Sequence, residues 1–473
     1  MGLIRTVPSH SRPVDRLESV IGADRYTKLR SAAADFRVRF AGRTIWNVNS
    51  TAAGGGVAEM LQVLVGYVTD LGIAIRWAVI HGDAEFFALT KRLHNSIHGY
   101  GGAAFTAEEA EHYRHILAAN GEELLADVRP GDIVLLHDPQ TAGLAGLLVD
   151  AGALVIWRSH IGVDRSNAAT EAAWAFLRPH VARAHGWVFS RRAYVPTWLP
   201  DRNTWIIPPS IDPFATKNED LAPDTVRAIL STIGVLDDAG ATGSTAFHRR
   251  DGGTATVTRP AVVVADNLPA PEDDLVIQVS RWDRLKDMPG VLHGFADHVA
   301  ADPGRYLALV GPSVTNVADD PEGAGIYADC LLQRRTLPAA VRARTLLVTL
   351  PLDDVDENAA MVNALQRHAS IVTQKSLAEG FGLTVAEAMW KSRPVIGSAV
   401  GGITDQIAAN AGVLLPDPTD LPAFGRAVRQ LLDDPEERSR MGAAAHAHVR
   451  ENFVGDLHLL RYAAAFNALT STP

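Results

Sequence analysis

The sequence contains only one cysteine, Cys330, among its 473 residues, and 44 basic against 54 acidic residues give a net charge of −10. A single cysteine cannot form an internal disulfide, and we interpret Cys330 as a buried core residue. No cluster of cysteines and histidines has the spacing of a zinc site. The acidic balance argues against nucleic acid as a main partner, because phosphate backbones attract basic proteins.

Long apolar runs are also absent from the sequence. None reaches the roughly 18 residues that a membrane-crossing helix needs, so we predict no transmembrane span. The first residues, Met1 to Arg5, are followed by proline and charged residues and lack the apolar core of a signal peptide. We therefore expect a cytoplasmic protein.

Short apolar strands that alternate with amphipathic helices dominate what is present. A chain of 473 residues is too long for one ordinary core and predicts two domains. Strands are predicted at 44–48, 73–80, 132–136, 154–157, 187–189 and 204–207, and again at 275–279, 307–310, 345–349, 371–374, 394–396 and 413–415. This alternation is typical of parallel sheets covered on both faces. We predict an α/β protein of two Rossmann-like, doubly wound domains that face a cleft.

Prolines and local composition set the predicted domain boundaries. Pro208 and Pro209 suit a linker, so the first domain is predicted over 1–212 and the second over 213–455. Residues 237–271 are rich in Gly, Thr, Asp and Pro and predict an exposed excursion, with a β-hairpin, that carries little chemistry. The amphipathic segment 456–473 is predicted to be a helix that crosses back onto the first domain.

The stretch Ser376–Trp390 places two carboxylates, Glu379 and Glu387, on either side of a turn with two glycines. An apolar run predicts a helix that begins near Leu383, so that Glu379 precedes it and Glu387 lies about one turn inside. Glycines let a ligand approach the backbone, and free N–H groups at a helix start attract an anion. The pattern fits sugar hydroxyls that flank a diphosphate. Two acids placed by the helix dipole, or a glycosidase acid/base pair, are the alternatives.

Charged residues follow two other predicted elements of the second half. Arg281 and Lys286 come directly after the strand 275–279, where they either clamp a diphosphate or form surface ion pairs. Asp354 and Asp356 form a D-x-D pattern that resembles a metal site. Because acidic loops are common, we interpret this pattern as a solvated helix start.

Polar residues and glycines follow predicted strands of the first half. Gly54–Gly56 lie between a strand and a helix, which suits either a phosphate contact or a tight turn, and the dinucleotide fingerprint is absent. Asp138, Gln140 and His160 follow two further strands, at the edge of the sheet where ligands bind. A lone histidine such as His160 is more often structural than catalytic.

These motifs resemble those of the retaining GT-B glycosyltransferases of the family-4 type. Ser376–Trp390 resembles their E-x7-E signature, Ser280–Lys286 their diphosphate-binding Arg/Lys pair, and Gly54–Gly56 their N-terminal loop. The likeness is closer still to glycosyl-transferring trehalose synthases and retaining trehalose phosphorylases. It is carried by Asn47–Thr51, Trp157–Ile161, Pro208–Pro213, Val362–Arg367 and Gln374–Thr384 and extends over nearly the whole chain.

The resemblance implies roles for the charged residues. Arg281 and Lys286 would hold the donor diphosphate and neutralise the leaving group in place of a metal ion, so we expect no metal and no cofactor. Glu387 would accept hydrogen bonds from the nucleotide ribose, and Glu379 from the hydroxyls of the transferred sugar.

The resemblance also implies roles for backbone groups and for the first domain. Phosphate and sugar would meet the backbone of the turn, which comprises Phe381, Gly382, Leu383 and Thr384. Gly55 and Gly56 would close over the diphosphate, and His160 would lie near the anomeric centre. Asp138 and Gln140 are expected to contact the acceptor.

By this resemblance the protein is expected to be a retaining hexosyltransferase. It would move glucose from a nucleoside-diphosphate glucose, such as UDP-glucose or ADP-glucose, to glucose and form α,α-trehalose by metal-independent, front-face attack. The alternatives are a trehalose phosphorylase, transfer to another small acceptor, and a non-catalytic sugar-nucleotide binding protein. The expected partners are small-molecule substrates, and the sequence leaves a homodimer open.

Overall fold

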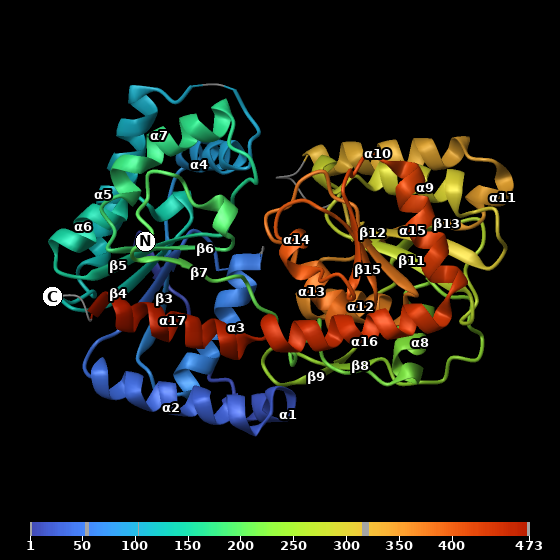
Figure 1. Cartoon of the computed structure of the whole chain (residues 1–473), viewed down its shortest axis with the longest axis horizontal. Coiled ribbons are helices and arrows are strands. Elements are labelled where there is room, and N and C mark those ends of the chain that lie inside the picture. The colour runs from blue at the N-terminus through green and yellow to red at the C-terminus, as the bar shows by residue number, and fades with distance from the viewer. Residues whose placement is uncertain (1, 53–55, 103, 315–320, 471–473) are drawn as a thin grey trace. The chain divides into compact units, whose positions relative to one another are not determined.

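The computed structural model describes residues 2–52, 56–102, 104–314 and 321–470. The chain divides into two compact units (Figure 1). Unit 1 comprises Met1–Ser210 together with Phe453–Pro473, and unit 2 comprises Ile211–Asn452. The last helix, α17 (Gly455–Thr470), therefore belongs to the first unit, where it packs against α2 (Ala23–Arg39).

Unit 1 contains a seven-stranded sheet in the order β1-β3-β2-β4-β5-β6-β7. Its strands are β1 (Ile4–Thr6), β2 (Ile45–Asn49), β3 (Ile75–Ile80), β4 (Ile133–His137), β5 (Leu154–Ser159), β6 (Gly186–Phe189) and β7 (Thr204–Ile206). All neighbours are parallel except β1, which pairs antiparallel with β3. The six parallel strands were predicted from the sequence, whereas β1 was missed because its three residues carry no alternating pattern.

Helices cover both faces of this sheet. They are α1 (Glu18–Ile21), α2, α3 (Gly56–Asp70), α4 (Ala84–Ile97), α5 (Ala107–Leu124), α6 (Leu144–Asp150), α7 (Ala168–Val181) and α17, with short 3-10 turns at Val14–Leu17, Pro139–Thr141 and Arg192–Tyr194. Alternate residues of β4 enter different cores. Val134 and Leu136 pack with α4 to α7, while Ile133 and Leu135 pack with α2 and α17. The sheet is thus buried on both sides, as a doubly wound fold requires.

Unit 2 repeats the architecture with the order β10-β13-β12-β11-β14-β15-β16. Its strands are β10 (Val262–Val264), β11 (Asp274–Val279), β12 (Arg305–Pro312), β13 (Thr345–Leu350), β14 (Ile371–Gln374), β15 (Val395–Ser398) and β16 (Gly412–Leu415). Its helices are α8 (Pro223–Thr232), α9 (Met288–His298), α10 (Pro321–Thr336), α11 (Ala339–Arg342), α12 (Val355–His368), α13 (Leu383–Trp390), α14 (Ile403–Gln406), α15 (Leu421–Asp433) and α16 (Pro435–Asn452), with a 3-10 turn η4 at Arg284–Lys286. Two α/β units of this kind confirm the predicted fold class.

The excursion 237–271 forms the predicted hairpin, from β8 (Ala246–His248) and β9 (Thr254–Thr256). The expectation that all of it is exposed was wrong. Phe247 and Val257 are each 2% exposed, and the last part of the excursion, β10, joins the edge of the main sheet antiparallel to β13. The excursion is therefore attached to unit 2 through backbone hydrogen bonds as well as side chains.

Arginines of the excursion neutralise the acids at the start of α12. Arg249 binds the carboxylate of Asp354, and Arg259 binds that of Glu357, whose side chain is only 3% exposed. Asp354 also caps the helix by accepting from the backbone N–H groups of Asp356 and Glu357. The D-x-D pattern is a helix start, as predicted, but its acids are paired with arginines and not merely solvated.

The single cysteine has the predicted structural role. Cys330 is fully buried on α10, and burial raises the pKa of its thiol to about 12.

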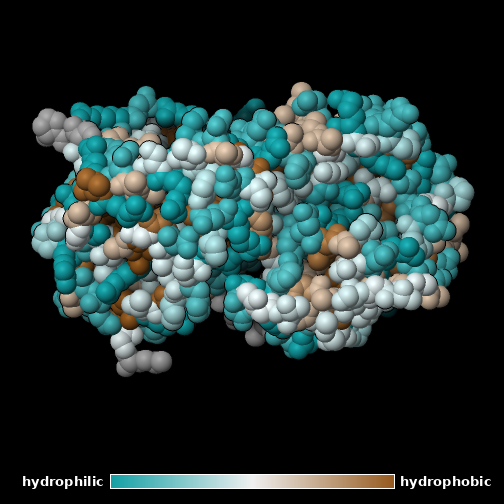
Figure 2. All heavy atoms as spheres, turned by 90° about the horizontal axis from the view of Figure 1, so that it is seen from below, coloured by the Kyte–Doolittle hydropathy of each residue, from teal (hydrophilic) through white to brown (hydrophobic). Residues whose placement is uncertain are grey.

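The face drawn in Figure 2 shows hydrophobic residues scattered among hydrophilic ones. Over the part of the chain that the structure describes, every helix is too short or too polar to cross a membrane.

Candidate functional site

The turn before α13 places the two glutamates of the Ser376–Trp390 motif. The helix begins at Leu383, as predicted, and its N-cap is Gly382, which has a φ of 78°. A Cβ atom on Gly382 would lie 3.0 Å from Cγ of Glu379, so both the conformation and the space favour glycine. Gly382 itself offers no side-chain cap, and within the first turn Oε1 of Gln406 accepts from the N–H of Ala386 at 3.0 Å. The N–H of Val385 bonds the Gly382 carbonyl, so the N–H groups of Leu383 and Thr384 are the ones that face an anion.

Glu387 lies one turn inside α13 and is only 6% exposed. Its Oε1 is 3.6 Å from Nζ of Lys217. Its Oε2 is buried and finds no hydrogen-bond partner among the described residues. A buried carboxylate oxygen without a donor is costly, and native structures leave few such atoms unsatisfied. The side chain is thus ready to accept a hydrogen bond from a ligand.

Glu379, on the loop before the helix, is brought together with Lys286. The Nζ of Lys286 lies 2.5 Å from Oε2 of Glu379, and both side chains are largely buried. Lys286 is held by its own backbone, since its carbonyl accepts from Nε2 of Gln278 at 2.6 Å. Two residues that lie 93 positions apart in the sequence therefore form one ion pair at the carboxyl end of the sheet.

Arg281 does not join this pair. Its guanidinium contacts Asp283 at 2.9 Å, and 62% of its side chain is exposed. Asp283 in turn caps η4 by accepting from the N–H of Leu285. The Arg281 charge is thus tethered at a strand end and open to solvent.

A polar cluster behind Glu387 was missed by the sequence analysis. Lys391 is buried and donates to Oδ1 of Asn218 at 3.1 Å, to Oε1 of Gln366 at 2.9 Å and to the Glu387 carbonyl at 3.0 Å. Burial lowers the pKa of Lys391 to about 7. A lysine four positions after Glu387 was the available signal, but its partners come from distant segments.

The remaining residues of the turn have structural contacts. Phe381 is buried, and its carbonyl accepts a hydrogen bond from Gln406. Thr384 donates to Oε1 of Gln374 at 3.0 Å. The turn is therefore anchored to α14 and to the end of β14, which fixes the backbone that the sequence assigned to phosphate and sugar.

In unit 1, Asp138 and His160 lie together at the ends of β4 and β5. Asp138 has a φ of 63°, and its Oδ1 accepts from the backbone N–H of His160 at 2.8 Å. Removal of its carboxyl from water raises the pKa of Asp138 to about 7. The Asp138 side chain thus holds the loop that carries His160. Gln140 follows, half-buried, in the turn Pro139–Thr141.

His160 is also bound through its ring. Its Nε2 is 2.9 Å from Nδ1 of His137, and Nε2 of His137 is 3.1 Å from Oδ1 of Asn47. Burial lowers the pKa of His137 to about 3, desolvation lowers that of the half-buried His160 well below its ordinary value, and the Arg158 cation lowers both further. Both rings are therefore neutral at physiological pH.

Arg158, which precedes this site in the Trp157–Ile161 motif, has a structural environment. Its side chain is fully buried and contacts Nε2 of His458 at 3.2 Å, the hydroxyl of Tyr462 and the carbonyl of Ile207. Because His458 and Tyr462 lie on α17, this arginine fastens the last helix to the strand that carries His160.

The glycine loop is only partly described. Gly55 lies outside the described residues, and Gly56 is the first residue of α3. Before the loop, Asn49 orders the chain by accepting from Nε1 of Trp77 at 2.8 Å and donating to the Thr51 carbonyl at 2.7 Å.

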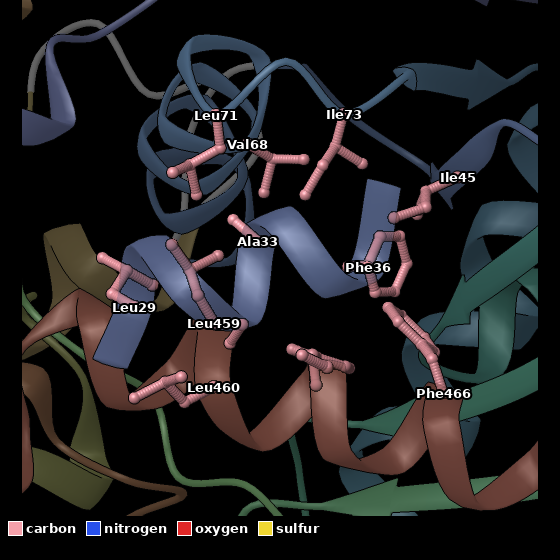
Figure 3. A pocket seen from close by; sticks show the side chains of 13 residues that line it. Leu29, Ala33, Phe36, Ile45, Val68, Leu71, Ile73, Leu459, Leu460 and Phe466 are labelled. Atoms are coloured by element: carbon pink, nitrogen blue, oxygen red, sulfur yellow. The ribbon is translucent and has the colours of Figure 1, made fainter. Parts of the chain in front are cut away.

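A separate pocket of unit 1 lies between α2, α3 and α17 (Figure 3). Its lining includes Leu29, Phe36, Val68, Leu460 and Phe466, and only Tyr462 among the lining residues has a polar side-chain atom. A ligand rich in hydroxyl groups finds no hydrogen bonds there, so we do not assign a sugar to this pocket.

The chain matches two family models and a series of known proteins. The model "Trehalose synthase, N-terminal domain" matches residues 47–196, and "Glycosyl transferases group 1" matches 354–448. A trehalose synthase from Pyrococcus horikoshii is 34% identical over 98% of this chain and 99% of its own. A trehalose phosphorylase from Pleurotus pulmonarius is 24% identical over 85% of this chain and 54% of its own.

One solved structure with the same fold is a UDP-forming α,α-trehalose-phosphate synthase from Burkholderia xenovorans. It has a TM-score of 0.66 to this chain and covers 91% of it and 100% of its own length, at 14% sequence identity. The likeness confirms the GT-B fold that the motifs predicted.

Proposed function

Since this chain belongs to the trehalose synthase family of glycosyltransferases, we propose that it transfers glucose, with retention, from a nucleoside-diphosphate glucose to glucose. The product is α,α-trehalose. The trehalose synthases that it resembles support the product, and the residues of unit 2 support the donor.

The observation that carries the donor assignment is the unpartnered oxygen of Glu387. Among the described residues, Oε2 of this buried carboxylate has no hydrogen-bond partner. Two ribose hydroxyls present adjacent donors, which match a carboxylate that is fixed in a helix and whose Oε2 lacks a protein donor while Oε1 faces Lys217. The buried Lys391 and Asn218 behind it keep the helix end from shifting.

The diphosphate would lie on cations and on the start of α13. Lys286 and Arg281 supply the positive charge, and the N–H groups of Leu383 and Thr384 supply hydrogen bonds. These groups neutralise the charge that develops on the leaving phosphate, so the proposed reaction needs no divalent cation. Glu379 would accept from hydroxyls of the transferred glucose while it orients Lys286.

In the proposed step, the bond between the anomeric carbon and the diphosphate oxygen breaks on the same face on which the acceptor hydroxyl attacks. The acceptor proton passes to the leaving phosphate. His160 would stabilise the developing charge at the sugar, held in place by Asp138.

A trehalose phosphorylase is the second candidate. It is favoured by the match to a trehalose phosphorylase and by the cations Lys286 and Arg281, since these suit inorganic phosphate as well as a diphosphate. The synthase reaction releases a nucleoside diphosphate, whereas the phosphorylase reaction releases glucose 1-phosphate.

The test is product analysis with purified protein. UDP-, ADP- and GDP-glucose are each mixed with glucose in the presence of a chelator, and trehalose and free nucleoside diphosphate are quantified. Parallel reactions contain trehalose and phosphate, and glucose 1-phosphate is measured. Trehalose formation with stoichiometric nucleotide release supports the synthase. Glucose 1-phosphate alone supports the phosphorylase, and nucleotide binding without either product refutes both.

A further inference from the structure

Three polar side chains form a hydrogen-bonded row that runs from the middle of β2 to the carboxyl ends of β4 and β5. Oδ1 of Asn47 lies 3.1 Å from Nε2 of His137, and Nδ1 of His137 lies 2.9 Å from Nε2 of His160. The two imidazole rings are nearly parallel, with an interplanar angle of 16°. Asn47 and His137 are 6% and 2% exposed, so water does not compete for the contact between them, and His160 at the other end of the row is half-buried.

The row determines which nitrogen of each neutral ring carries the proton. An amide oxygen only accepts, so the contact with Oδ1 of Asn47 places the His137 proton on Nε2. Nδ1 of His137 then has a lone pair and accepts, so the His160 proton lies on Nε2. The nitrogen that remains to His160 is Nδ1, and it is unprotonated.

We propose that Asn47 and His137 are positioning residues that lock His160 in the Nε2–H tautomer, so that its Nδ1 is an obligatory hydrogen-bond acceptor for a substrate hydroxyl. This proposal rests on the proposed function for the identity of the substrate. It gives His160 a defined part in the reaction, because a ring held in this way orients a hydroxyl and does not donate a proton to the leaving phosphate.

The charged groups around the row keep it neutral. Arg158 lies near both rings and would repel a proton added to either, and burial, complete at His137 and partial at His160, disfavours the charged form. Asp138 contacts the His160 backbone N–H and not its ring. Neutral rings are necessary for the argument, since a protonated imidazole donates from both nitrogens.

The tautomer is read directly by NMR on the full-length protein. Histidines are labelled with 15N, and two-bond proton–nitrogen correlations distinguish protonated from unprotonated ring nitrogens. The His160 signals among the 17 histidines are identified by their loss in His160→Gln. The proposal expects the His160 proton on Nε2 in wild type. A proton on Nδ1 overturns it, because the Asn47 amide and both rings would then be reversed.

Two substitutions of His137 separate positioning from core filling. His137→Phe preserves the aromatic ring and the stack but removes both hydrogen bonds. His137→Asn loses volume, yet its amide reaches the position of Nδ1 and still accepts from His160. If His137 only fills the core, Phe is tolerated and Asn is harmful. We expect the reverse for turnover: His137→Phe lowers kcat roughly 10- to 100-fold with little change in the donor KM, and His137→Asn restores much of it.

A third variant tests the far end of the row. Asn47→Leu has a similar shape without an acceptor, and we expect His137 and His160 to populate both tautomers in its spectrum. A wild-type tautomer in this variant would refute the role of Asn47. If the protein forms no trehalose at all, the proposed function fails, while the NMR result still decides the tautomer.

Discussion

Asp138 provides a test of the electrostatics at the end of β4. Its pKa is raised from the ordinary value of 3.8 to about 7, chiefly by burial, against the opposing effects of the His160 N–H and of Arg158. The folded protein therefore binds this proton more tightly than the unfolded chain does. The stability contributed by Asp138 is present at low pH and is lost as the pH rises from about 4 to about 7, above which it is constant.

The substitution Asp138→Asn removes this titration while its amide oxygen still accepts from the His160 N–H. With the two pKa values above, linkage gives at most about 2.5 kcal/mol of stability lost by wild type between pH 5 and pH 8. Between pH 5 and pH 8, the free energy of unfolding of the variant minus that of wild type should therefore rise by about the same amount. The measurement is urea unfolding of both proteins at several pH values, compared as a difference so that other titrating groups cancel.

The exposed Asp35 on α2 supplies the matched control. Asp35→Asn should change the pH dependence of the free energy of unfolding by much less. If the difference in the free energy of unfolding between wild type and Asp138→Asn does not change from pH 5 to pH 8, Asp138 is already ionised in the folded protein, and burial does not raise its pKa.

Three further predictions follow from unit 2. Glu387→Gln should raise the donor KM roughly 10-fold, because a charge-assisted hydrogen bond is lost. The control Glu436→Gln, at an exposed position of α16, should leave KM unchanged. An unaltered KM in Glu387→Gln would contradict the ribose assignment. Arg281→Ala should lower kcat/KM for the nucleotide donor at least roughly 10-fold without lowering the melting temperature, since its side chain is mostly exposed, and full activity would refute the clamp. Arg259→Ala should cost about 1–2 kcal/mol of stability by leaving the buried Glu357 carboxylate with fewer partners. It should also speed proteolysis within 237–271, and an unchanged cleavage rate would show that Arg259 is not needed to hold the excursion beside β10 and Arg249.

The regular part of the fold was predictable because buried parallel strands are continuous apolar runs. The parallel strands of both sheets were placed in this way. The two strands that were missed, β1 and β10, are antiparallel edge strands of three residues each. Nothing in so short a segment distinguishes it from a loop, since its position depends on a partner strand far along the chain.

The candidate site was predictable only where residues of one local motif act together. Glu379, Gly382 and Glu387 belong to one turn and one helix, so spacing alone placed them. The contacts of Lys391 with Asn218 and of His137 with Asn47 join segments 173 and 90 residues apart. Such contacts form only in the folded chain. The sequence shows them only as polar residues within otherwise apolar elements, which does not identify their partners.

The placement of charge in unit 2 suggests how its cations remain ready for a ligand. Lys286 is held by Glu379, and Arg281 by Asp283. If Lys286 binds the phosphate and Glu379 the sugar of one donor, the ion pair does not need to break when the donor arrives. Glu379 then keeps Lys286 as its partner, and the Lys286 side chain loses little conformational freedom when the donor binds. The acids at the start of α12 are instead paired with Arg249 and Arg259. The two sets of ion pairs thus differ: the first would preorganise a site for an anion under the proposed function, and the second fastens the excursion to unit 2.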